Sequence, residues 1–541
     1  MQVQWPRRFR VMWPLALLVG ALALAVAATS CTRSAGPPQA KQTKLTRVDL
    51  YGDPENLDPI LKDKISALVL NSAIFEQLLN YDVVQKKLTP ELATEWTVGP
   101  DGLTYTFKLR QGAKFHNGRE IKADDVKYSF ERLLNPDNMS PLSSTLASIK
   151  GAKEFTEKKA TEVAGIKVTG PYSLTIELAE PDPTFLLRLT NICCSVVPKE
   201  EVQKLGADFG MKPVGSGPYK FDSWVKDSKV VLVANKDHWA GPPKIDVIET
   251  LIVKEAATRD AMFAAGQIDY MLLGDPQYLK YKNDPKWANN LVEVAELYTR
   301  HIAFNCQRPP FNNKLVRQAI NYAIDRKTLV DTLLQGKAYP ATGLFPPTLM
   351  GYDPELKGYP YDPEKAKALL KEAGYPKGFE FEVLCTSHPA WGTPAVEAIQ
   401  PYLEAVGIKV KPVQVEWGVM IDRANAGDFQ AYMYSVCGAV HPYDWLLLFH
   451  TKSFGGAGNR MRYSNPEVDR LVDQMKATTD EGEMIRLARE AQKIIVDDAP
   501  WWFFNYNKAV IVHQPWVKGL IPNPVDMDYQ PLDKLSVEGK P

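Results

Sequence analysis

The 541-residue sequence has few of the features that identify an enzyme or a metalloprotein. It contains no GxSxG, HExxH, GxxxxGK[ST] or GxGxxG motif, so serine hydrolase, zinc protease, P-loop and dinucleotide chemistry have no local support. Its seven histidines are dispersed, and the nine-residue spacing of His441 and His450 does not suit a helical metal pair. We therefore expect no enzyme activity, no metal site and no cofactor.

An excess of charge of one sign is also absent, and cysteine is scarce. Basic and acidic side chains both number 64, and the 61 basic and 64 acidic side chains after residue 30 give no electrostatic basis for nucleic-acid binding. No CxxC pair occurs, which argues against structural zinc. Five cysteines beyond the N-terminal region cannot all pair within one chain, and we interpret them as buried thiols. They are Cys193, Cys194, Cys306, Cys385 and Cys437.

Only one apolar run is long, from Val11 to Ala28. Three Arg precede this run, small residues end it, and Cys31 follows, which is the order of an export signal with a lipoprotein processing site. We predict a signal peptide over residues 1–30, a lipid anchor on Cys31 and a polar, Pro-broken tether over residues 31–44. The competing interpretation is an uncleaved anchor, because the run is nearly long enough to span a bilayer. Both interpretations place the domain outside the cytoplasm, in the periplasm or on the cell exterior.

The remaining chain alternates between strand and helix patterns. Residues 103–109 alternate apolar and polar side chains, as a strand with one wet face does. After a turn at Asn117-Gly118, Val126, Phe130, Leu133 and Leu134 fall on one face of a helix. A strand, a helix and a strand follow one another again between residues 379 and 415. The pattern predicts an α/β fold.

Three stretches resemble, in order, the family 5 extracellular solute-binding proteins, which are peptide and nickel receptors of bacterial ABC importers. They are Leu88–Leu134, with DGLTYTFKLRQGAKFHNG and ADDVKYSFERL, then VGSGPY at Val214–Tyr219, and the run His301–Arg326. The resemblance implies a periplasmic-binding-protein-like two-lobe α/β fold of type II with an extra domain. It also implies hinge strands near Thr299 and over Trp501–Asn507. One departure is Lys122, where the family usually has a Thr or Ser that would cap the helix.

The resemblance also implies a division into domains and a ligand cleft. Domain I would comprise 45–76, 214–298 and 505–541, domain II 77–213, and domain III 299–504. The Trp501–Phe504 strand should show only alternate residues to the cleft. Candidate ligand-binding residues are Trp417, Tyr434, Val436, Cys437, Gly438, Ala439, Trp391, Asn305, Tyr128 and Phe504.

Compared with the peptide receptors of this family, the sequence lacks two charged residues that bind the ends of a peptide. Peptide receptors of this family hold the ligand's amino group with an Asp in the segment that matches Ser435–Ala439, and Ala439 stands in that place. The Arg that holds the ligand's carboxylate is missing from Thr386–Pro394. A charge buried without a partner costs several kcal/mol, so these absences favour an oligosaccharide or another non-peptide solute. Asp444, five residues after Ala439, is an alternative carboxylate for the ligand's amino group.

Family frequency nevertheless favours a peptide. An extended peptide is also compatible with the missing charges, because backbone pairing to an open strand edge needs no particular side chain. We therefore expect a monomeric receptor that captures a small solute, peptide or saccharide, and delivers it to ABC permease subunits. We expect it to contact the membrane through its lipid anchor and to bind no nucleic acid. An exported hydrolase remains a remote alternative.

Overall fold

The computed structural model describes residues 42–49, 51–61, 65–478 and 480–541. The predicted signal peptide, Cys31 and most of the predicted tether lie outside the described residues. Within the described ranges, no helix is long and apolar enough to cross a bilayer.

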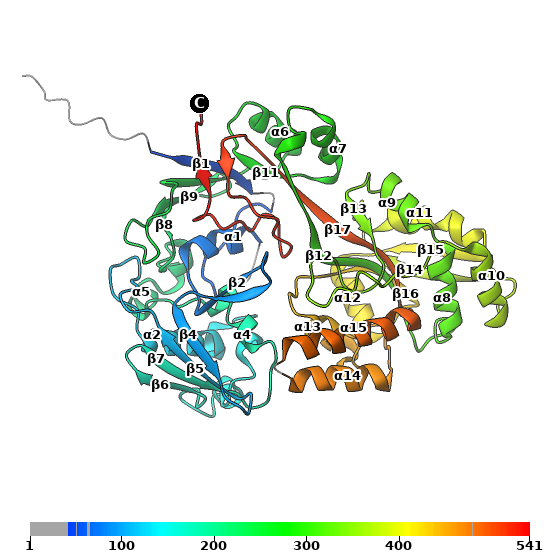
Figure 1. The fold of residues 1–541 in the computed structure, drawn as a ribbon, viewed down its shortest axis with the longest axis horizontal. Helices are drawn as coiled ribbons and strands as arrows, with labels where there is room; N and C mark the ends of the chain where they lie inside the picture. Colours follow the sequence, from blue (N-terminus) through cyan, green and yellow to red (C-terminus); the bar gives the residue numbers. More distant parts are fainter. Residues whose placement is uncertain (1–41, 50, 62–64, 479) are drawn as a thin grey trace, which may run out of the picture. The chain divides into compact units, whose positions relative to one another are not determined.

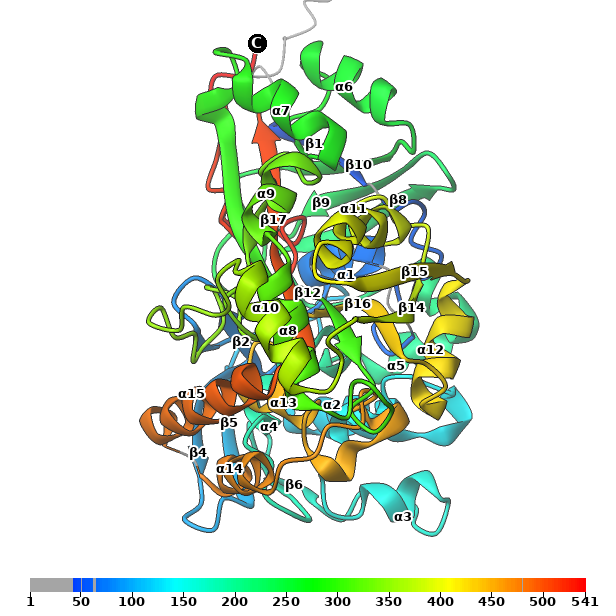
Figure 2. The ribbon, with the colours of Figure 1, turned by 90° about the vertical axis from the view of Figure 1, so that its right-hand side faces the viewer.

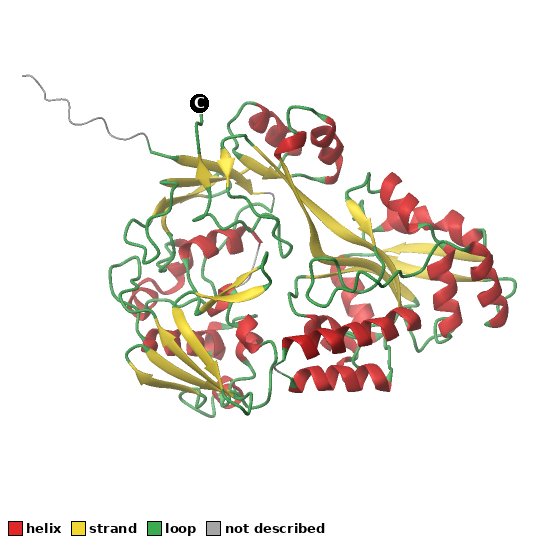
Figure 3. Ribbon diagram, in the orientation of Figure 1, coloured by secondary structure: helices red, strands yellow, loops and turns green. Residues whose placement is uncertain are grey.

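The largest element is an eleven-stranded mixed sheet (Figures 1 and 3). Its strands in spatial order are β15 (Ile408–Gln414), β14 (Phe379–Cys385), β16 (Ala431–Cys437), β12 (Leu291–Phe304), β17 (Trp501–His513), β11 (Tyr270–Leu272), β1 (Lys44–Asp49), β10 (Val247–Ile252), β9 (Lys229–Ala234) and β8 (Tyr219–Val225). The short strand β13 (Ala338–Pro340) pairs beside β17. Sequence-distant segments therefore share one hydrogen-bonded layer.

Two long strands, β12 and β17, connect the two halves of this sheet (Figure 1). At one end β17 pairs with β11, and at the other end β12 pairs with β16. The register between the two long strands shifts between Ala295 and Thr299 and again between Arg300 and His301. Because such irregularities bend strands and interrupt the ladder, these positions form the hinge between two lobes.

The first lobe surrounds β1 and β8–β11 and includes α1 (Ile65–Ile74), α6 (Ala256–Ala264) and α7 (Asp275–Asn283). The small domain, defined as residues 79–205, has its own antiparallel sheet. The order of that sheet is β4 (Ala93–Val98), β5 (Thr104–Leu109), β7 (Ser173–Glu177) and β6 (Ile166–Gly170). The small domain also contains a hairpin and four helices, β2 (Leu79–Asp82), β3 (Lys87–Pro90), α2 (Ala123–Leu134), α3 (Ala152–Thr156), α4 (Phe185–Arg188) and α5 (Lys199–Leu205).

Helix α2 has the apolar face predicted from the sequence. Val126, Phe130, Leu133 and Leu134 are all buried in the core of the small domain. The helix lacks a side-chain cap at Lys122. Instead, the backbone N–H of Lys122 donates to the carboxylate of Asp125 at 2.8 Å. The carboxylate of the N3 residue therefore satisfies the backbone N–H of the N-cap residue, which is one of the two hydrogen bonds of a capping box.

The second lobe comprises residues 314–498 together with the attached ends of β12 and β17. Its helices are α8 (Lys314–Ala323), α9 (Arg326–Thr332), α10 (Pro363–Glu372), α11 (Thr393–Glu404), α12 (Trp417–Ala426), α13 (Pro442–Leu447), α14 (Pro466–Ala477) and α15 (Glu481–Asp498). Helix α8 packs on β17 (Figure 2). Trp501 and Phe503 lie in one core of this lobe, and Trp502 and Phe504 lie in another. The alternation along β17 thus separates two cores rather than a core from an open cleft.

The VGSGPY segment passes close to the end of α1. A Cβ atom at Gly215 would lie 2.0 Å from the carbonyl oxygen of Ile74, and one at Gly217 would lie 2.5 Å from that of Ala73. Only glycine permits so close a backbone approach. The backbone N–H of His116 also donates to the carbonyl oxygen of Gly215 at 2.8 Å. This segment joins the small domain to the first lobe.

Candidate functional site

Aromatic side chains form a row beside the end of β16. Tyr434 stacks on Trp417 with ring centroids 5.5 Å apart and an interplanar angle of 17°. Trp417 meets Trp391 edge to face at 6.0 Å, and Trp391 stacks on His388 at 4.6 Å. Trp417 is the first residue of α12 and is 47% exposed. Three of the predicted ligand-binding residues therefore come together on one surface.

The aromatic row continues inward through His301 on β12. Its ring meets Tyr434 at 6.0 Å and stacks on Trp501 at 3.5 Å with an interplanar angle of 9°. Burial lowers the pKa of His301 to about 3, so the imidazole is neutral at neutral pH. Its Nδ1 atom lies 3.0 Å from the carbonyl oxygen of Thr299, which assigns the proton to Nδ1. His301 therefore acts as a neutral ring in this row.

A cavity of about 190 Å³ opens beside these rings. Its walls include the predicted residues Tyr434, Val436 and Ala439. Gly438, also predicted, follows β16 with a φ of +86° and turns the chain toward α13. Cys437 ends β16. The predicted segment of residues 434–439 thus borders one cavity.

One edge of β16 is open next to this cavity. The parallel partner β14 pairs with β16 only at Ala431 and Tyr432, whereas the antiparallel ladder with β12 continues to Cys437. Among the described strands, none pairs with residues 433–437 on the side away from β12. Alternate backbone N–H and C=O groups there face away from the sheet, as in an edge strand. We call residues 433–437 the open edge.

Asp444 of α13 places a carboxylate on the cavity wall. Its Oδ1 atom lies 3.8 Å from Nη2 of Arg188 in the small domain, and Nε of Arg188 donates to Asp182 at 3.0 Å. Burial raises the pKa of Asp444 to about 6, with Arg188 opposing the rise and Asp182 adding to it. Among the residues that the structure describes, the cation within 4.0 Å of this carboxylate is Arg188, which Asp182 also binds.

Arg460 contributes the other charge on the cavity wall. Its guanidinium carbon lies 5.5 Å from the ring centroid of Tyr434, and its Nε donates to the side-chain oxygen of Asn425 at 2.8 Å. Neither Arg460 nor His301 was among the residues predicted from the sequence. The two come to Tyr434 from distant parts of the chain, so no local pattern could have identified them.

Three predicted residues lie elsewhere. Asn305 is buried, and its amide donates to the carbonyl oxygens of Gly427 and Phe429. Tyr128 packs against the core of the first lobe. Phe504 is 0% exposed and stacks on Trp502 at 4.8 Å. The structure does not bring these three together with the aromatic row, and we do not include them in the candidate site.

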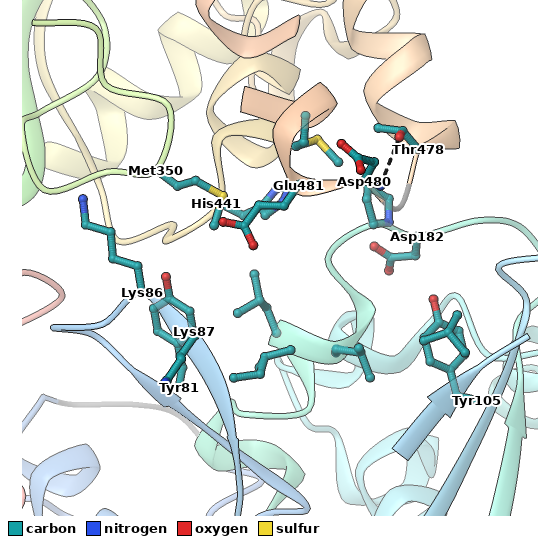
Figure 4. A pocket seen from close by; sticks show the side chains of 16 residues that line it. Tyr81, Lys86, Lys87, Tyr105, Asp182, Met350, His441, Thr478, Asp480 and Glu481 are labelled. Carbon is teal, nitrogen blue, oxygen red and sulfur yellow. Dashed lines mark hydrogen bonds between the residues drawn. The ribbon is translucent and has the colours of Figure 1, made fainter. Parts of the chain in front are cut away.

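A larger cavity, of about 370 Å³, lies between the small domain and the second lobe (Figure 4). Lys86 and Lys87 of the β2–β3 hairpin lie on one side, and Asp480 and Glu481 at the start of α15 lie on the other. Burial and the charge of Glu481 raise the pKa of Tyr81 in this cavity to about 12. The small-domain wall thus carries Lys86, Lys87 and Asp182, and the facing wall carries Asp480 and Glu481.

The hinge strands, the two lobes and a cavity beside an open strand edge define a solute receptor. Residues 87–457 match the model of the bacterial extracellular solute-binding proteins, family 5. The chain is 33% identical over 486 residues to heme-binding protein A of Haemophilus influenzae, across 86% of this chain and 87% of the relative. It is 28% identical over 514 residues to the dipeptide-binding protein of Escherichia coli, across 90% and 93% of the two chains.

The structure of HbpA2 from Haemophilus parasuis superposes with a TM-score of 0.82 at 27% sequence identity, covering 92% of this chain and 100% of that chain. The chain belongs to the family 5 bacterial extracellular solute-binding proteins. The family and the two-lobe α/β fold predicted from the sequence are confirmed. Members of this family bind solutes outside the cytoplasm, and the chain is accordingly a substrate-binding component of an ABC importer.

Proposed function

We propose that this protein is a lipid-anchored receptor that binds an extended peptide in the cleft between its lobes and presents it to an ABC permease. The observation that carries the proposal is the open edge at residues 433–437. The backbone groups of this edge that face away from β12 are the partners that an added peptide strand requires. Because such pairing uses main-chain groups, it does not depend on the side-chain charges that are missing at Ala439 and in Thr386–Pro394.

The aromatic row supports the same proposal. Trp391, Trp417 and Tyr434 lie beside the open edge and provide apolar area for a ligand's side chains. The adjoining cavity of about 190 Å³ would receive one end of the ligand. A few polar groups within a mostly apolar pocket are typical of small-molecule sites. Binding without chemical conversion is therefore the activity that this arrangement supports.

Closure of the lobes would complete the site. We propose that domain I comprises 45–76, 214–298 and 505–541, that domain II comprises 77–213, and that domain III comprises 299–504. The register shifts in β12 lie within a few residues of the boundary between 298 and 299. A ligand that shifts the ratio of closed to open protein from 1:99 to 99:1 must bind the closed state about 5.5 kcal/mol more tightly than the open state. The opposite charges of Lys87 and Glu481 across the larger cavity favour such closure.

We also propose that residues 1–30 are removed as a signal peptide and that Cys31 carries the lipid anchor of a monomeric receptor. The order of Arg residues, apolar run, small residues and Cys31 supports this. In a detergent partition assay, the Cys31→Ser variant should move from the detergent phase to the aqueous phase. Retention of the variant in the detergent phase would instead support an uncleaved anchor.

A non-peptide solute is the second candidate. The half-exposed ring of Trp417 and the missing carboxylate at Ala439 are its support, because stacking on a sugar or another planar ligand needs neither charge. Native mass spectrometry separates the two candidates when the purified protein is mixed with a pool of tripeptides and, separately, with a pool of maltooligosaccharides. Capture of peptides alone is expected. Capture of saccharides alone would overturn the peptide proposal.

The same experiment tests for hydrolysis. The bound peptides are released with acid after prolonged incubation and their masses are compared with those of the starting pool. Intact peptides are expected from a binding protein. Recovery of cleaved products in amounts that rise with protein concentration would support the alternative function, an exported hydrolase.

A further inference from the structure

A segment near the C-terminus crosses the hinge. After β17 the chain turns back, and residues 524–528 run beside β12 (Figure 1). The backbone N–H of Leu297 donates to the carbonyl oxygen of Pro524 at 2.7 Å. Leu297 falls within the first register shift of β12, between Ala295 and Thr299. The segment therefore contacts the hinge strand where its pairing with β17 is interrupted. We call residues 524–528 the strap.

Both lobes hold side chains of the strap. Val525 packs against the core of the second lobe that contains Trp501. Met527, two residues later, is 0% exposed in the core of the first lobe. The carboxylate of Asp528 pairs with Arg47 of β1 at 2.5 Å, and both side chains are almost fully buried. The strap is therefore attached to the two lobes on either side of the hinge.

Asp526, at the centre of the strap, lies among other carboxylates. Its Oδ1 atom accepts a hydrogen bond from the backbone N–H of Asp528 at 2.8 Å. Burial raises the pKa of Asp526 to about 7, and the nearby carboxylates of Asp528 and Glu296 add to the rise. The guanidinium of Arg47 opposes it. Glu296 is itself buried on β12 and accepts from the side-chain amide of Asn507. Ionisation of Asp526 therefore adds a repulsive charge to the strap.

The charged and titratable groups around Asp526 and its carboxylate neighbours come from several elements. They are Arg47, Asp49 and Tyr51 at the end of β1, Glu296, Tyr298 and Arg300 on β12, Lys337 before β13, and Asp528 in the strap. Burial raises the pKa of Glu296, and Lys337 and Arg300 oppose that rise. Burial also raises the pKa of Asp49 to about 6. Protonation of Asp526 thus removes one charge from a group of four carboxylates.

We propose that the strap restrains rotation of the two lobes about the hinge and loosens when Asp526 ionises. Rotation changes the position of one lobe's core relative to the other, and the strap is packed into both cores. Movement about the hinge must therefore displace Val525 or Met527 from its core. This inference goes beyond the proposed peptide-binding function, because it concerns the motion of the lobes and not the solute.

The raised pKa of Asp526 gives the direction of the pH effect. A carboxyl group whose pKa is higher in the closed strap than in the displaced strap stabilises the closed strap when it is protonated. This stabilisation is lost as the pH rises through about 7. With an ordinary pKa of about 3.9 in the displaced strap, linkage predicts about a tenfold loss of strap closure between pH 6 and pH 8. The lobes should therefore move more freely at pH 8.

Hydrogen–deuterium exchange of the mature, ligand-free protein at pH 6 and pH 8 tests the strap, after correction for the intrinsic exchange rates. The reporters are the amides of Leu297, which donates to Pro524, and of Asp528, which donates to Asp526. Their protection factors should be about tenfold higher at pH 6 than at pH 8 in the wild-type protein. Asp526→Asn keeps an oxygen acceptor without the charge. At pH 8 it should show about the protection that the wild-type protein has at pH 6.

Two further variants control the result. Asp533→Asn removes a carboxylate later in the same C-terminal region, where it pairs with Lys534, and should keep the wild-type pH dependence. Val525→Ala weakens the attachment to the second lobe and should lower the protection of the Leu297 amide at both pH values. Urea unfolding of each variant shows that it is folded.

Small-angle X-ray scattering of the same samples reports the motion of the lobes. The wild-type data should require a wider spread of lobe separations at pH 8 than at pH 6, and the Asp526→Asn data should require the same spread at both. Equal protection of wild type at the two pH values, or no gain of protection in Asp526→Asn at pH 8, overturns the role of Asp526. A pH-dependent protection with an unchanged spread of separations overturns the restraint on the lobes. Each of these outcomes leaves the peptide receptor intact.

Discussion

Replacement of Trp417 by Ala tests whether the aromatic row contacts ligand. A Trp side chain buries up to about 250 Å², and Trp417 is 47% exposed. Roughly 120 Å² of its surface is thus available to a ligand, which at about 25 cal/mol per Å² corresponds to about 3 kcal/mol for complete coverage. Coverage of half this area gives about 1.5 kcal/mol, or a little more than a tenfold change in Kd.

The assay is isothermal titration calorimetry with one peptide identified in the capture experiment. Trp417→Ala should weaken its binding by about tenfold to one-hundredfold. Val419→Ala is the matched control, because Val419 lies on the same helix and is 50% exposed but contributes no aromatic ring. A change of less than about twofold in Trp417→Ala, in a protein that unfolds cooperatively, would refute a role of this ring in binding.

The other predictions concern stability. Asp528→Ala leaves Arg47 unpaired in a fully buried ion pair and should cost about 3–5 kcal/mol in urea unfolding; a loss below about 1 kcal/mol would show that the pair contributes little. Gly215→Ala places its Cβ 2.0 Å from a carbonyl oxygen and should lower the free energy of unfolding by about 2 kcal/mol or more. The control Gly418→Ala, with no atom within 4 Å of its added Cβ, should leave the free energy of unfolding unchanged. Equal stability of these two variants would exclude the close approach.

Local sequence patterns were sufficient to predict the small domain and its helix. Val126, Phe130 and Leu133 recur at helical spacing, and the structure buries all three. The N-terminal end of α2 was less predictable, because Lys122 makes no side-chain cap hydrogen bond and the carboxylate of Asp125 instead accepts from the backbone N–H of Lys122. Periodicity identifies which side chains face inward, but it does not identify their partners.

The candidate site depends on contacts that periodicity cannot predict. Tyr434 and His301 meet because β16 and β12 pair in one register, although the two residues are more than one hundred positions apart in the chain. Phe504 was expected in the cleft because strand residues alternate, but the alternation does not tell which face of β17 a helix covers. The structure covers both faces, and Phe504 lies in a core. Strand order, rather than composition, therefore determines which aromatic residues can reach a ligand.

The central claim is that a peptide pairs with the open edge. Hydrogen–deuterium exchange of the backbone amides of residues 433–437, with and without a captured peptide, tests this claim most directly. Alternate amides in this segment point away from β12 and should exchange more slowly once a peptide strand accepts hydrogen bonds from them. Unchanged exchange across residues 433–437 at saturating peptide, with protection appearing elsewhere, would contradict the account.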